Sequence, residues 1–166
     1  NIFEGIEGDD TPVVLVVTYG NREYDDALLE LKNLAIENGF IPVAAAAFLA
    51  VHSYSDKLAS GRPDENDREI MGNFGRTIRE KYLRKNDYKG TLIVKGNYPY
   101  KEGMSYTPLA PEVSEDCTQC GECVSVCPVA AINPDDPTKT NPDLCIRCCA
   151  CVRICPVEAR KFTAQP

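Results

Sequence analysis

All nine cysteines of this 166-residue chain lie between Cys117 and Cys155. Eight of them follow one pattern that occurs twice, as CTQCGECVSVCP over residues 117–128 and as CIRCCACVRICP over residues 145–156. Dense local cysteines are typical of metal ligands, whereas a secreted disulfide scaffold spreads its cysteines along a short chain. The pattern therefore indicates a metal site kept reduced, which predicts a cytoplasmic protein.

The spacing within each copy favours an iron–sulfur cluster over a zinc ion. Three cysteines at C-x2-C-x2-C can wrap one face of a small cluster, and the fourth, three residues further on and followed by proline, ligates the other cluster. Zinc is the alternative, but its sites typically use separated C-x2-C pairs, which two tetrads fit poorly. We expect two [4Fe–4S] clusters with exchanged fourth ligands: Cys117, Cys120, Cys123 and Cys155 for one, and Cys145, Cys148, Cys151 and Cys127 for the other.

The two copies form an internal repeat with an offset of 28 residues. Three further pairs recur in register: Pro128 with Pro156, Val129 with Val157, and Ala131 with Ala159. Cys149 lies outside the repeated spacing, and we expect it to be a small packing residue rather than a ligand, since free cysteines often behave as buried hydrophobes. A redox role for Cys149 would require exposure and a low pKa.

On these motifs, residues 117–156 resemble the 2[4Fe–4S] ferredoxin family. The resemblance implies a low-potential carrier of single electrons, with a potential that depends on the hydrogen bonding and exposure of the clusters.

The chain is acidic, with a net charge of −7 and a pI near 4.8. This charge argues against nucleic-acid binding, which depends on phosphate neutralisation. It suits docking on a basic patch of a redox partner, although acidity that only aids solubility fits equally well. The longest apolar run, over residues 41–51, contains proline and is too short to span a bilayer, so no membrane insertion is expected.

The residues before the motifs predict an α/β domain. The run PVVLVVT, over residues 12–18, indicates a strand buried on both faces, and residues 40–50 indicate a second strand. Between them we expect a helix that Asp25 or Asp26 caps and Gly39 ends. Its apolar face consists of Leu28, Leu31, Leu34 and Ala35.

A second helix is expected from Pro63 to about Leu83, and a short strand over residues 91–94. The buried stripe of this helix consists of Ile70, Phe74, Ile78 and Tyr82. The order β-α-β-α implies parallel strands. So few strands cannot cover both faces of a sheet, so we expect a missing N-terminal half or another chain to complete it, and the start at Asn1 favours a fragment.

This organisation predicts three segments. Residues 1–95 form a partial α/β domain, residues 96–112 a connector rich in proline and glycine, and residues 113–166 the cysteine-rich domain.

The segments VVLVVTYGNREYDDALLEL, RPDENDREI and KGNYPY resemble prokaryotic proteins that fuse a flavodoxin-like domain to a C-terminal 2[4Fe–4S] ferredoxin. The resemblance implies a partial flavodoxin-like, doubly wound parallel sheet followed by a small α+β ferredoxin-like domain, in an anaerobe. It places Tyr19, Gly20 and Asn21 beside a flavin. The family's phosphate-binding loop has no counterpart before Pro12, so FMN is expected only in the complete protein. His52 is expected to be structural.

The favoured function is electron transfer, in which two clusters relay single electrons to or from a flavin or a redox partner. The first alternative is a flavin-dependent reductase with a built-in ferredoxin domain and a substrate pocket near Tyr19 and His52. The second is a docking role for the N-terminal half without a cofactor. An electron carrier is favoured over a stand-alone enzyme.

Overall fold

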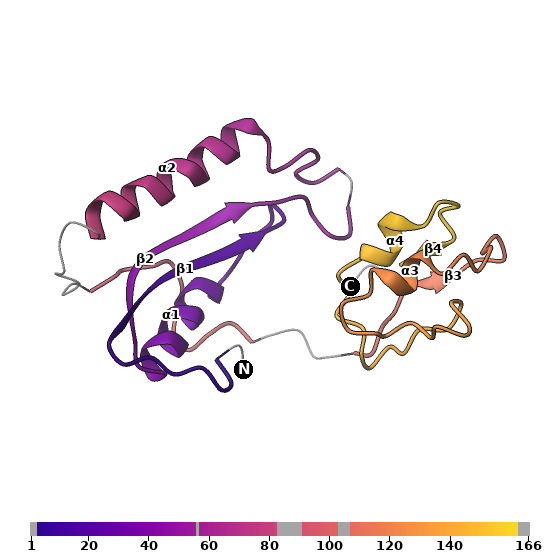
Figure 1. Cartoon of the computed structure of the whole chain (residues 1–166), viewed down its shortest axis with the longest axis horizontal. Helices are drawn as coiled ribbons and strands as arrows, with labels where there is room; N and C mark the ends of the chain where they lie inside the picture. The colour runs from indigo at the N-terminus through magenta and orange to yellow at the C-terminus, as the bar shows by residue number, and fades with distance from the viewer. Residues whose placement is uncertain (1–2, 56, 83–90, 103–106, 163–166) are drawn as a thin grey trace. The chain divides into compact units, whose positions relative to one another are not determined.

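The computed structural model describes residues 3–55, 57–82, 91–102 and 107–162. The chain divides into two compact units, Asn1–Gly103 and Met104–Pro166 (Figure 1). The division falls inside the connector expected over residues 96–112, of which residues 103–106 lie outside the described part.

The first unit is built on two parallel strands. Strand β1 (Thr11–Tyr19) and strand β2 (Phe40–Leu49) pair so that Leu15 lies beside Ala45, with a bulge between Val13 and Val14. Helix α1 (Ala27–Glu37) connects the strands, and helix α2 (Glu65–Tyr82) follows β2. The two helices lie on opposite faces of the sheet (Figure 1). The expected order β-α-β-α with parallel strands is confirmed.

The core of the first unit lies between the sheet and α1. Leu15, Leu28 and Ala35 are 2%, 5% and 0% exposed, and Phe3 completes the cluster. Leu31 and Leu34 pack against it, so the predicted apolar face of α1 is confirmed. This cluster packs α1 against the sheet.

Strand β1 is not buried on both faces, contrary to expectation. Val14 and Val16 point away from α1 and are 38% and 45% exposed, whereas Leu15 between them is buried. Helix α2 packs on this second face mainly against β2, where Phe48 and Phe74 stack edge to face with ring centroids 5.6 Å apart. One helix on a two-stranded sheet covers only part of that face.

Helix α1 begins and ends where predicted, but the side chain of its N-cap residue does not form the expected cap. Asp26 is the N-cap residue, yet its side chain makes no cap hydrogen bond. Its carboxylate instead accepts hydrogen bonds from the backbone N–H groups of Asn97 (2.7 Å) and Lys101 (2.6 Å). These bonds lower the pKa of Asp26 and tie residues 97–101 to the first unit. Gly39 follows the helix with a φ of 81°, as expected for a C-terminal glycine.

Helix α2 begins with a reciprocal cap. The backbone N–H of Asp67 donates to the Asp64 carboxylate, and the N–H of Asp64 donates to the Asp67 carboxylate, both at 2.9 Å. Arg62 also binds the Asp67 carboxylate through two nitrogens. This pairing lowers the pKa of Asp67 to about 2, since the Arg62 hydrogen bonds favour the charged form.

Two expectations for the rest of the first unit are wrong. Ile70 is 51% exposed, because the covered stripe of α2 passes through Asp67 and Met71 instead. Phe74, Ile78 and Tyr82 are half-buried as predicted. Leu83, the expected helix end, lies outside the described residues. Residues 91–94 form no strand: Ile93 is 89% exposed, and Lys32 Nζ donates to the Leu92 carbonyl (3.4 Å) where a strand ladder would need a backbone partner.

The second unit is small and repeats itself. Helices α3 (Glu122–Ser125) and α4 (Ala150–Ile154) occupy equivalent places in the two copies of the motif. Strands β3 (Glu112–Val113) and β4 (Arg160–Lys161) pair antiparallel, and Ile132 bridges Thr140. The matched residues Ala131 and Ala159 are both buried, at 4% and 2% exposure. The internal repeat is thus visible in the fold. In neither unit does the described structure contain a helix long and apolar enough to cross a membrane.

Candidate metal centre

Two hollows in the second unit are lined by cysteine thiols from both halves of the repeat. The first is lined by Cys117, Cys120, Cys123 and Cys155. The second is lined by Cys127, Cys145, Cys148 and Cys151, together with Cys149. The fourth cysteine of each motif therefore lines the hollow of the other motif, and the first three cysteines of its own motif line the other hollow.

The backbone of each motif turns through the same left-handed positions. Gln119 and Arg147 have φ values of 56° each, and Ala130 and Glu158 have 50° each. Such residues let a short loop curl back on itself, and here the curl brings every third side chain to one side. The local sequence thus directs three thiols inward from each loop.

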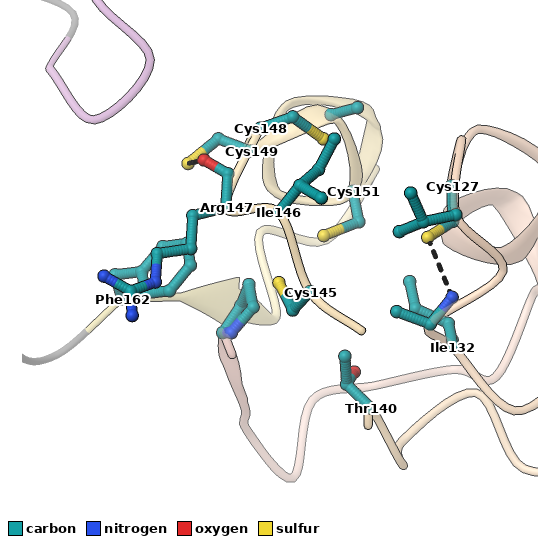
Figure 2. Close-up of a pocket in the computed structure, with 14 residues that line it drawn as sticks. Cys127, Ile132, Thr140, Cys145, Ile146, Arg147, Cys148, Cys149, Cys151 and Phe162 are labelled. Atoms are coloured by element: carbon teal, nitrogen blue, oxygen red, sulfur yellow. Dashed lines mark hydrogen bonds between the residues drawn. The ribbon is translucent and has the colours of Figure 1, made fainter. Parts of the chain in front are cut away.

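The second hollow is seen in Figure 2, where the sulfurs of Cys127, Cys145 and Cys151 point toward one another. The sulfur of Cys149 points away from them to the other side of the loop, and lies 3.8 Å from the Arg147 carbonyl. Cys149 is 4% exposed, and burial raises the pKa of its thiol to about 11. It is a buried thiol beside the hollow, in agreement with its expected packing role.

Each fourth cysteine receives a hydrogen bond from the backbone. The N–H of Ala131 donates to Cys127 Sγ, and the N–H of Ala159 donates to Cys155 Sγ, both at 3.2 Å (Figure 2 shows the first). A backbone N–H that points at a sulfur stabilises a thiolate and a thiolate-bound metal. The buried alanines of the repeat therefore place a donor at each hollow.

The donor set fits clusters better than isolated ions. Among the described residues, no group of three or more His, Cys, Asp and Glu side chains is arranged to hold a single metal ion. A [4Fe–4S] cluster binds one thiolate per iron, so its four sulfurs stand farther apart than the four ligands of one zinc ion. At least four thiols line each hollow, one of them with a backbone donor, which is enough for the four thiolates that one such cluster binds.

One buried cation lies beside the cysteines and has no counterpart in the sequence expectations. Arg160 lines the first hollow and is 2% exposed. Burial raises the pKa of the Cys151 thiol in the second hollow, and the Arg160 guanidinium opposes that rise. An arginine shortly after a C-P motif carries no local signal of burial, so only the fold reveals it.

In the first unit, a cleft of about 300 Å³ lies at the carboxyl ends of β1 and β2. Tyr19, the last residue of β1, and Gly20 line it on one side, and His52 and Tyr54 of the loop after β2 line it on the other. A Cβ on Gly20 would lie 2.9 Å from the His52 Cα atom, so the two loops meet closely only because residue 20 is glycine. The structure thus brings together the two loops expected to flank a ligand.

The three expected flavin contacts do not all lie at this cleft. Tyr19 packs edge to face on Tyr24, with ring centroids 5.3 Å apart, and Asn21 is absent from the lining. Asn21 has a φ of 61° and belongs to the turn after β1. His52 Nδ1 accepts a hydrogen bond from the Tyr54 N–H (3.2 Å), in keeping with a structural role.

Comparison with known families gives one match. Residues 112–156 match the family model described as a 4Fe-4S dicluster domain. No curated protein matches the chain, and no solved structure does. The match covers both cysteine motifs and supports an iron–sulfur electron-transfer role for the second unit, which is a ferredoxin-type domain.

Proposed function

We propose that the protein is an electron carrier whose second unit holds two [4Fe–4S] clusters with exchanged fourth ligands. The observation that carries the proposal is the composition of the two hollows, each of which takes three cysteines from one motif and the fourth from the other. The proposed ligands are Cys117, Cys120, Cys123 and Cys155 for the first cluster, and Cys145, Cys148, Cys151 and Cys127 for the second.

The proposed ligands differ in how far they are exposed to solvent. Cys120 and Cys148, which are equivalent in the repeat, are the two exposed cysteines, while Cys123 is buried. The apolar side chains of Ile146 and Leu144, 59% and 50% exposed, lie beside Cys148 in the sequence. An exposed ligand with apolar neighbours suits brief contact with a partner, because the path for an electron is short there.

When bound, each cluster supplies one-electron chemistry: it gains the electron that a reduced partner loses, and returns it to an oxidised partner. The protein contributes the thiolates and the backbone donors from Ala131 and Ala159. We further propose a protein partner with a basic docking patch and a reducing cytoplasmic setting.

For the first unit we propose a partial flavodoxin-like domain with a flavin at the cleft beside Tyr19 and Gly20. The cleft is at the lower end of the size range of small-molecule sites, and it lies beyond the carboxyl ends of parallel strands, where ligands of such sheets bind. In this arrangement the flavin exchanges electrons with the clusters, and a flavin-dependent reductase is the second candidate function.

The deciding experiment is a count of iron, sulfide and flavin per chain in anaerobically purified protein, with electron paramagnetic resonance after reduction. About eight irons and eight sulfides per chain support two clusters. Four or fewer irons, or zinc without sulfide, would overturn the cluster proposal. Saturable uptake of FMN separates the flavin proposal from a first unit that serves only for docking.

A further inference from the structure

Arg160 is the only buried cation among the residues that the structure describes. Its guanidinium donates to Thr140 Oγ1 (3.0 Å) and to the Pro137 carbonyl, both of which are neutral. In the described part of the chain no carboxylate forms an ion pair with it. An arginine stays charged at any ordinary pH, and burying its charge is costly unless an opposite charge lies close by.

Arg160 lies beside cysteine thiols, which carry negative charge as thiolates. It is a lining residue of the first hollow but not of the second, and its charge also acts on the Cys151 thiol of the second. Arg160 lines the first hollow together with Cys117, Cys120, Cys123 and Cys155. A cluster ligated by four thiolates is anionic, and it becomes more so on reduction. A cluster in this hollow therefore gives the buried guanidinium an opposite charge close by.

The repeat provides an internal comparison. Twenty-eight residues before Arg160, the equivalent position is Ile132, which is 3% exposed and lines the second hollow. The two hollows thus share their ligand spacing and their backbone donors to sulfur, but one has a buried cation where the other has an aliphatic side chain.

We propose that Arg160 makes the two clusters inequivalent, by raising the reduction potential of the cluster at the Cys117 motif above that of its twin. The inference rests on the two-cluster function proposed above. A fixed positive charge in a poorly solvated site stabilises the reduced, more negative form of a cluster more than its oxidised form. An electron shared between the clusters therefore resides mainly at the hollow with Arg160. Arg160 acts as a positioning residue for charge, not as a ligand.

The test is a potentiometric titration of the full-length protein with reconstituted clusters, followed by electron paramagnetic resonance. Arg160→Gln keeps a hydrogen-bonding side chain and removes the charge, Arg160→Lys keeps the charge, and Lys161→Gln removes a charge from the exposed neighbouring position on β4. Iron and sulfide are counted first on the wild type, so that a failure of the cluster proposal is recognised before any variant is compared.

The titration should show two one-electron steps, and we expect Arg160→Gln to lower the potential of the step at the higher potential. At a fixed applied potential, the ratio of reduced to oxidised cluster in that step should fall at least tenfold, which corresponds to 59 mV for one electron. Arg160→Lys and Lys161→Gln should each stay within a threefold change, the latter because solvent and salt screen an exposed charge. Unchanged potentials in Arg160→Gln at full iron content would overturn the inference. If Arg160→Gln loses iron, retention by Arg160→Lys supports a role of the charge, and equal loss by both variants would overturn it.

Discussion

Gly121 and Cys149 occupy equivalent positions in the two halves of the second unit, and both have a left-handed backbone, with φ values of 80° and 59°. Each is the N-cap residue of a short helix, α3 or α4. A residue with a side chain is disfavoured in this conformation by roughly 1–2 kcal/mol, so the ninth cysteine stands where the repeat uses glycine. Position 149 therefore corresponds to Gly121 of the first copy and not to one of its four cysteines.

Replacing Cys149 by alanine should leave both clusters in place. The sulfur points away from the other thiols of the hollow, so we expect about eight irons per chain and a loss of unfolding free energy of about 1 kcal/mol from the missing buried sulfur. Iron analysis and thermal unfolding measure the two effects. Cys151→Ala is the matched control and should lose iron; equal iron loss in both variants would make Cys149 a ligand.

Replacing Cys155 by serine should damage the cluster of the first motif. We expect iron to fall by about one to four atoms per chain, and iodoacetamide to modify Cys117, Cys120 and Cys123 while the second set stays protected. Mass spectrometry of the alkylated peptides identifies the exposed thiols. Cys127→Ser is the mirror control and should expose Cys145, Cys148 and Cys151. Modification near each mutated residue's own motif would contradict the exchanged ligation.

The ion pair between Asp67 and Arg62 should make the first unit more stable at neutral pH than in acid. Since the pKa of Asp67 in the fold is about 2, below the ordinary value of 3.8, its contribution is complete above about pH 4 and is lost as the pH falls toward 2. Carbon NMR of the Asp67 carboxyl group between pH 5 and 1 tests this directly, and titration near 4 would contradict it.

Asp67→Asn removes the charge and should lower the urea midpoint of the first unit at pH 7, with a smaller difference from wild type at lower pH. Glu65→Gln, in the same helical turn, is the control. Its ion pair with Arg68 (3.4 Å) is exposed, and such pairs contribute little. Equal effects of the two variants would contradict a special role of Asp67.

The close contact between Gly20 and His52 should make residue 20 intolerant of a side chain. Gly20→Ala forces the loops apart, and we expect a loss of about 1–3 kcal/mol of unfolding free energy together with weaker uptake of FMN. Gly75→Ala is the control, because no atom lies near its added methyl group on α2. That substitution should stabilise the helix by about 0.5–1 kcal/mol. Denaturant unfolding and flavin titration measure both variants.

The sequence was informative where the signal is local. Strand β1 formed where the apolar, β-branched run begins at Pro12, and helix α1 formed over the spaced leucines and ends before Gly39. Strand β2 follows as expected. In each case the residues of the element itself carry the signal. The same holds for the cysteine repeat, in which spacing alone brings three thiols of a loop to one side.

Features that depend on contacts between distant segments could not be read in advance. Residues 91–94 have strand-forming side chains, but a strand exists only where a neighbouring edge accepts it. Asp26 is a residue type that commonly caps helices, yet its carboxylate accepts hydrogen bonds from the backbone N–H groups of Asn97 and Lys101 instead. Buried Arg160 donates hydrogen bonds to Thr140 and Pro137, which lie about twenty residues earlier in the chain. No pattern of apolar residues around Arg160 in the sequence predicts that burial.

The exchange of the fourth cysteines has a consequence for integrity under proteolysis. Residues 129–144 join the two motifs, and they contain the polar turn of Asn133, Asp135 and Asp136. With the proposed ligation, the two fragments of a chain cleaved in this turn stay associated, because each cluster binds cysteines from both fragments. The covalent link between the halves then becomes dispensable once the clusters are loaded, and the metals serve as the cross-links of a small domain.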